Sequence, residues 1–72
     1  MTTFTTFYQL NNPVDCTVLR TWSEFVEDSE ATIIINVRKQ LISVVAPLEL
    51  QELASSWLDK GKELNLLDLW KP

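Results

Sequence analysis

The stretch from Thr32 to Gly61 constrains the fold more than any other part of the chain. It opens with an apolar, β-branched run from Thr32 to Val37, which the polar residues 38–40 interrupt, and a second apolar run follows from Leu41 to Ala46. Pro47 closes this second run, and apolar residues at helical spacing continue toward the only glycine. Two strand-length apolar runs joined by a short polar segment predict a β-hairpin that leads into a helix.

Both faces of the predicted hairpin are largely apolar. Side chains alternate along a strand, so Ile33 and Ile35 share one face while Ile34 lies on the other. A chain of 72 residues has few elements with which to cover two faces, and a second copy of the chain is the simplest cover. We therefore expect a homodimer or a tight hetero-complex. The turn lacks an Asn-Gly or Asp-Gly pair, which predicts a longer or bulged loop at residues 38–40.

The first part of the chain predicts a strand and a helix. Thr2 to Leu10 is rich in Thr, Phe and Tyr, which predicts an N-terminal edge strand, with a flexible N-terminal arm as the alternative. Asn12 or Asp15 can cap a helix that runs to about Asp28. One stripe of that helix is apolar and predicts its buried side; it consists of Val18, Leu19, Trp22, Phe25 and Val26.

The last part of the chain predicts a second helix and an apolar tail. Pro47 suits the first helical position, and Gly61 suits the left-handed residue that ends a helix. We assign residues 1–61 to a single α+β domain of order β-α-β-β-α, and residues 62–72 to a short apolar C-terminal tail. We expect this tail to bind a partner or form a dimer, with Trp70 and Leu67 as anchors; the alternative is that it completes the core. Its candidate partner-binding residues are Leu64, Leu66, Leu67, Leu69 and Trp70.

The composition argues against catalysis. The chain has no histidine and only one cysteine, so we expect no metal site of nitrogen or sulfur ligands, and no motif for a cofactor is found. The paired carboxylates Glu24 and Glu27, or Glu49 and Glu52, lie three residues apart and are better explained as solvated helix faces. Catalytic residues, cofactors and metals are therefore all predicted to be none, and we expect a protein that is not an enzyme.

Charge and cysteine usage bear on partners and location. The net charge is −4, which disfavours a protein dedicated to binding nucleic acid, and only Arg38 and Lys39 form a projecting basic pair. This pair could touch phosphates, with an ordinary solvated turn as the alternative, so we expect nucleic-acid binding that is weak at best. No apolar run approaches the roughly 20 residues that span a bilayer, and no secretion signal is recognised. With the single Cys16, these features predict a cytoplasmic protein with no membrane contact.

Residues 32–58 resemble the Phd/YefM family of bacterial antitoxins. The resemblance rests on the apolar strand at residues 33–36, the turn Val37-Arg38-Lys39-Gln40, the second strand and the segment Pro47-Leu48-Glu49. It implies a homodimeric module that binds operator DNA and a C-terminal segment that wraps a toxin. Arg38 and Lys39 would match the basic turn, and residues 64–70 the toxin-binding segment. The glycine that this family often places between helix and strand is absent from residues 29–31.

Three hypotheses of function follow. The first is a small non-enzymatic protein-interaction module, with an antitoxin-like protein that binds and neutralises a partner protein as its specific form. The second is an accessory or structural subunit of a larger assembly. The third is a weak DNA-binding regulator in which Arg38 and Lys39 dominate. Salt-dependent DNA binding separates the third hypothesis from the first two.

Overall fold

The computed structural model describes residues 2–11 and 15–71. Four strands, two α-helices and one 3₁₀-helix follow one another along the chain: β1 (Thr3–Leu10), α1 (Cys16–Glu27), β2 (Thr32–Asn36), β3 (Leu41–Pro47), η1 (Leu48–Leu53), α2 (Ala54–Glu63) and β4 (Leu67–Leu69). The predicted α+β class and the order β-α-β-β-α are confirmed, with β4 as an added strand.

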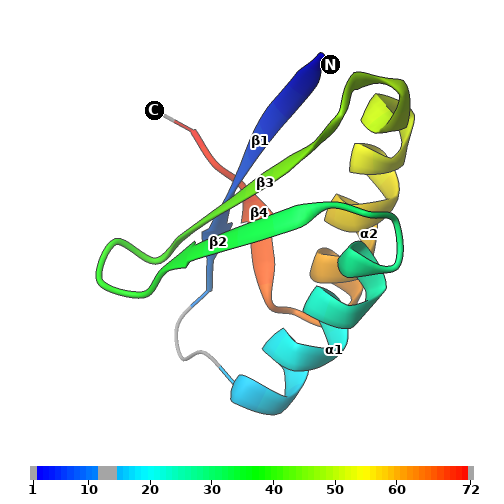
Figure 1. The fold of residues 1–72 in the computed structure, drawn as a ribbon. Coiled ribbons are helices and arrows are strands. Elements are labelled where there is room, and N and C mark those ends of the chain that lie inside the picture. The colour runs from blue at the N-terminus through cyan, green and yellow to red at the C-terminus, as the bar shows by residue number, and fades with distance from the viewer. Residues whose placement is uncertain (1, 12–14, 72) are drawn as a thin grey trace.

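The four strands form one antiparallel sheet in the order β2-β3-β1-β4. The N-terminal strand is therefore central rather than at an edge, since it pairs with β3 on one side and with β4 on the other. Both helices cover the same face of the sheet, and the opposite face has no layer of described residues over it (Figure 1). The fold thus has two layers.

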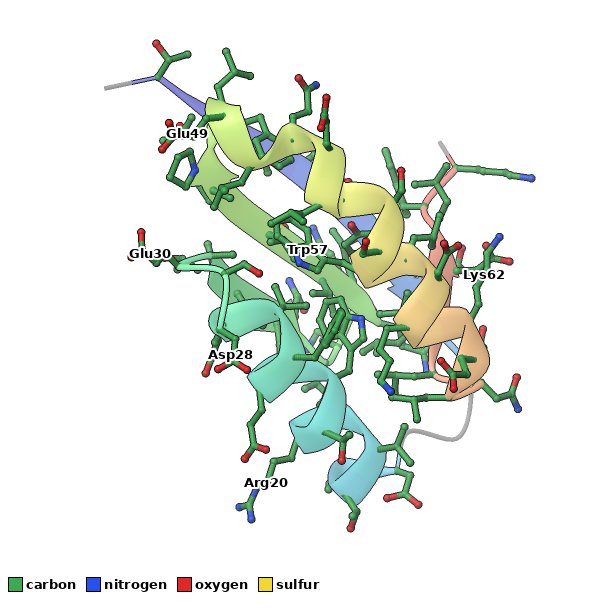
Figure 2. The ribbon with its side chains drawn as sticks, turned by 90° about the vertical axis from the view of Figure 1, so that its right-hand side faces the viewer. Arg20, Asp28, Glu30, Glu49, Trp57 and Lys62 are labelled. Carbon is green, nitrogen blue, oxygen red and sulfur yellow. The ribbon has the colours of Figure 1, made fainter. Side chains whose placement is uncertain are left out.

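Two tryptophans form the centre of the core between the sheet and the helices. Trp22 of α1 is fully buried, and its indole Nε1 donates a hydrogen bond of 2.8 Å to the carbonyl of Trp57 in α2. The ring of Tyr8 from β1 meets Trp22 edge-on at 5.7 Å between centroids. Figure 2, which looks onto the helices, shows Trp57 pointing inward beneath α2. These ring contacts join both helices to the sheet. Large aromatic side chains also contribute much of the buried surface in a small core.

Helix α1 begins after Asp15, one of the two predicted N-cap residues. Asp15 is the N-cap, and its carboxylate accepts hydrogen bonds from the backbone amides of Thr17 and Val18 at 2.8 and 3.3 Å. Asn12, the other predicted cap, lies outside the described residues. After the helix, Glu30 adopts a φ of 63° and donates its amide to the carbonyl of Glu27. A glutamate thus stands in the left-handed conformation for which glycine is preferred.

The hairpin loop is longer than two residues, as predicted. Asn36 and Leu41 form the last pair of β2 and β3, so residues 37–40 make the turn. The amide of Gln40 donates to the carbonyl of Val37 at 3.2 Å, and Gln40 has a φ of 54°. The side chain of Asn36 accepts a hydrogen bond from the amide of Lys39, which stabilises the turn without a glycine.

The prediction that Gly61 ends the second helix is wrong. The segment after Pro47 begins as η1, and α2 continues through Gly61 to Glu63. Asn65 takes the left-handed position instead, with a φ of 55°. The helix ends with two hydrogen bonds: the amide of Leu66 donates to the carbonyl of Gly61 at 2.9 Å, and the amide of Asn65 donates to the carbonyl of Lys62 at 3.0 Å. Gly61 serves close packing, because a Cβ atom there would lie 2.5 Å from Cγ of the buried Leu67.

No helix in the described part of the chain is long and apolar enough to cross a membrane.

Candidate interaction surface

The face of the sheet opposite the helices has no covering layer among the described residues (Figure 1). Alternation and register place one set of side chains on it: Thr3, Thr5, Phe7 and Gln9 of β1, Leu41, Ser43, Val45 and Pro47 of β3, Thr32, Ile34 and Asn36 of β2, and Asp68 of β4. We call this set the open face. Trp70 follows β4 and joins it, since its ring meets that of Phe7 at 5.9 Å between centroids.

Large apolar side chains of the open face are accessible to solvent. Ile34 is 56% exposed, Trp70 42% and Phe7 40%. Leu41 and Val45 lie on β3, the strand between β2 and β1, and are half-buried. The backbone amide of Trp70 donates to the carbonyl of Phe7 at 3.3 Å, which holds the tryptophan against β1. The open face therefore has aromatic groups at one side and an exposed isoleucine at the other.

The open face is almost free of charge. Strands β1, β2 and β3 contain no charged residue at all. Asp68 in β4 is the exception among the described residues of this face, and its carboxylate lies 3.6 Å from Nζ of Lys62. The backbone amide of Leu69 and then Lys62 lower the pKa of Asp68. Threonine, serine and amide groups fill the remaining positions, so the surface combines apolar patches with neutral hydrogen-bonding groups.

The structure divides the predicted partner-binding residues of the tail into two groups. Leu66 and Leu67 belong to the core, with 3% and 1% of their surface exposed, and Leu64 packs against that core. Leu69 and Trp70 are exposed at 46% and 42%. The tail is thus part of the sheet through β4, and its surface contribution comes from its last two apolar residues.

The predicted basic pair lies at the tip of the hairpin. Arg38 and Lys39 are exposed in the turn between β2 and β3, at the end of the molecule away from the joint between α1 and β2 (Figure 1). Figure 2 shows Arg20 and Lys62 on different helices and pointing to different sides. The structure does not bring these four cations together into one basic surface.

Chemically reactive side chains elsewhere in the described residues include the carboxylates, Cys16 and Tyr8. In residues 2–11 and 15–71, no three acidic, cysteine or histidine side chains are grouped so that they could hold a metal ion. Cys16 is exposed at the first residue of α1, beside Thr17 and Arg20 in a shallow hollow. Burial raises the pKa of Tyr8, whose hydroxyl lies 3.4 Å from the carbonyl of Ala54. This hydroxyl therefore has a structural partner in the core.

Sequence reasoning recognised the apolar hairpin faces but did not assemble the open face. Nothing local in the sequence indicates that the N-terminal strand lies beside β3. The pairing of Phe7 with Ser43 and of Thr5 with Val45 joins residues about half of the chain apart. The excess of uncharged residues in all three long strands was the available signal.

No family model, curated protein or solved structure matches this chain.

Proposed function

We propose that this protein is a non-enzymatic protein-interaction module whose contact surface is the open face, with Phe7, Ile34 and Trp70 as its main apolar contacts. The observation that carries the proposal is the combination of exposed large apolar side chains with the near absence of charge on one whole side of the sheet. A solvated sheet face is ordinarily lined with polar and charged residues. A protein partner with an apolar surface is the occupant that this chemistry suits.

The energetics favour such a partner. Burial of apolar surface contributes about 25 cal/mol per Å², and aromatic residues are enriched among those that dominate binding. Phe7 and Trp70 already contact each other, so little side-chain freedom remains to be lost when they are covered. Trp70 keeps, within the open face, the partner-binding role that the sequence predicts for the tail, whereas Leu69 pairs with Tyr8 and lies on the other face of the sheet.

The same surface is poorly suited to nucleic acid. Binding to a phosphate backbone requires lysine and arginine, and none of the described residues of the open face is basic. Arg38 and Lys39 are the groups that a DNA-binding role would use. These two cations lie at the hairpin tip of a chain whose net charge is −4, and this acidic balance disfavours binding to phosphates. A regulator that binds DNA therefore ranks below a protein-interaction module.

Two forms of the proposal differ in the partner. An antitoxin-like protein would neutralise a toxic partner, whereas an accessory subunit would stabilise a larger assembly. The single cysteine supports a cytoplasmic location for either form, because an exposed thiol with no second cysteine suits a reducing compartment.

Phe7 and Phe25 provide a matched test. Both are phenylalanines with 40% exposure, but Phe7 lies on the open face and Phe25 on α1. The tagged chain, Phe7→Ser and Phe25→Ser would each be expressed in the source cells, and the captured proteins identified by mass spectrometry. We expect a stoichiometric partner with the unchanged chain and with Phe25→Ser, and at least a tenfold loss with Phe7→Ser. Each variant first needs a cooperative thermal transition as evidence that it folds.

Equal capture by both variants would show that the partner does not use the open face. Loss with Phe25→Ser alone would move the contact surface to the helical side, where Phe25 meets the Lys60 ammonium.

A further inference from the structure

Strand β2 is an edge strand without the usual protection. Its outer side has no neighbouring strand among the described residues, and its sequence, Thr-Ile-Ile-Ile-Asn, contains neither charge nor proline. The other edge, β4, has only three residues and carries Asp68. Natural proteins shield edges with short strands, charges or proline, because a bare edge offers its backbone to another strand. One edge of this sheet is shielded, and the other is open for pairing.

The register identifies which backbone groups of β2 are free. The amide of Leu10 donates to the carbonyl of Gln40, so the carbonyl of residue 40 is directed toward β1. Alternation along β3 then directs residues 41, 43 and 45 toward β2, where they pair with Asn36, Ile34 and Thr32. The peptide groups of Ile33 and Ile35 consequently point away from the sheet. Two donors and two acceptors are presented along the edge.

The two ends of β2 carry opposite charge. The acidic joint, consisting of Glu27, Asp28 and Glu30, precedes the strand, and the basic turn, consisting of Arg38 and Lys39, follows it. All five side chains are exposed, and the joint and the turn lie at opposite ends of the strand (Figure 1). Figure 2 shows Asp28 and Glu30 projecting from the same side of the molecule. An antiparallel copy of β2 would set each acidic joint beside a basic turn, whereas a parallel copy would set like charges together.

We propose that β2 pairs antiparallel with β2 of a second copy of this chain, about a two-fold axis at Ile34. In this register Ile33 and Ile35 of each copy face Ile35 and Ile33 of the other, so their free amides and carbonyls form four hydrogen bonds. The two Ile34 side chains meet at the axis, where the 56% exposed surface of each is covered. Glu30 of each copy lies across from Arg38 of the other. The charges select the orientation, and the backbone bonds and isoleucines supply the affinity.

The pairing has a consequence for the shape of the assembly. Two four-stranded sheets become one continuous sheet, and the two-fold axis keeps both pairs of helices on one side. The open faces of the two copies then join on the other side into a single surface. This self-association uses the backbone edge of β2 and does not rest on the proposed function; Ile34, which lies on both the edge strand and the open face, is the residue that the two surfaces share.

Amide exchange on the purified chain tests the pairing without any substitution. In a monomer the amides of Ile33 and Ile35 exchange rapidly, while that of Ile34 is protected by β3. We expect the protection of Ile33 and Ile35 to rise with protein concentration, together with a mass that approaches twice the 8.3 kDa of one chain. A monomeric mass at high micromolar concentration, or a dimer in which these two amides remain unprotected, would overturn the proposal.

Charge reversal tests the orientation. The first variant, Asp28→Lys/Glu30→Lys, has two basic ends, and the second, Arg38→Glu/Lys39→Glu, has two acidic ends. We expect each alone to dissociate at concentrations where the unchanged chain is dimeric, and an equimolar mixture of the two to form a heterodimer. Asp59→Lys/Glu63→Lys on α2 changes the net charge as the first variant does, and we expect it to remain a homodimer.

Dimers of both reversed variants that are as stable as the original would exclude the antiparallel β2 interface. Failure of the mixture to associate, with both variants folded by circular dichroism, would exclude it as well. Because the readout is the mass of the purified chain alone, these results are independent of whether a different partner binds the open face.

Discussion

At the scale of single residues, the contact between Gly61 and Leu67 connects the second helix to the last strand. A Cβ atom at residue 61 would stand 2.5 Å from Cγ of Leu67, which is buried in the core and cannot move aside freely. We expect Gly61→Ala to lower the free energy of unfolding by about 1–3 kcal/mol, the range for overpacking a core. Chemical denaturation measures this change.

As a control, the effect of Gly61→Ala on the free energy of unfolding should change sign when Leu67 is shortened. In a Leu67→Ala background the crowding is removed, so Gly61→Ala should raise the free energy of unfolding by up to about 1 kcal/mol, because alanine is the better helix former. Equal destabilisation by Gly61→Ala in both backgrounds would contradict the role of close packing.

Glu30 lies in a backbone conformation that suits glycine better than glutamate. Its φ of 63° places it in the left-handed region, which costs a residue with a side chain about 1–2 kcal/mol. We expect Glu30→Gly to raise the free energy of unfolding by roughly 1 kcal/mol. Ser29→Gly is the matched control, since Ser29 is not among the positive-φ residues and glycine there should give no gain. A loss of stability in Glu30→Gly as large as that in Ser29→Gly would refute this account of the joint.

Because Tyr8 is buried, we expect the stability of the fold to decrease at alkaline pH. Burial raises its pKa above the usual 10.0, so the folded chain holds the phenolic proton more tightly than the unfolded chain does. The contribution of Tyr8 to stability is therefore complete below pH 10.0 and declines as the pH rises through the folded-state pKa. Thermal unfolding from neutral to alkaline pH should show this decline, and Tyr8→Phe should lessen it. An unchanged alkaline limb in Tyr8→Phe would assign the decline to other groups.

At the scale of elements, β4 makes the tail part of the fold. Removal of residues 65–72 deletes Leu66 and Leu67 from the core and leaves β1 without one neighbour. We expect this truncated chain to lose cooperative thermal unfolding, because a core this small tolerates little loss. Removal of residues 70–72 takes away only exposed or terminal groups and should preserve the transition. A cooperative transition in the longer truncation would show that β4 is dispensable.

Local patterns determined how well each element was predicted. Alternation along β2 correctly separated Ile34 from Ile33 and Ile35. The cap at Asp15 and the apolar stripe located α1, although Phe25 of that stripe is 40% exposed. The tail is harder to predict, since its apolar residues between Leu64 and Trp70 follow no regular period. Lys60-Gly61 has the composition of a helix end, and the contact with Leu67 shows that the glycine serves close packing inside the helix instead. The same long-range pairing hid the open face, whose residues come from four separate strands.

At the scale of the whole molecule, the charges lie outside the three long strands and sum to −4. We expect binding to duplex DNA to be weak at physiological salt, because an acidic molecule with a single exposed basic pair releases few counterions. Fluorescence anisotropy with labelled DNA measures this binding. Sub-micromolar, sequence-specific affinity that falls in Arg38→Ala/Lys39→Ala would rank the regulator hypothesis above the interaction module.

Site-specific photo-crosslinking in the source cells tests the open face most directly. Replacement of Phe7 by a photoreactive phenylalanine keeps an aromatic ring beside Trp70, and the same replacement at Phe25 is the control with equal exposure on α1. We predict a crosslink at Phe7 to a second, different protein in near-stoichiometric yield, and little or none at Phe25. Crosslinks from Phe25 with none from Phe7 would contradict an interaction module that works through the open face of its sheet.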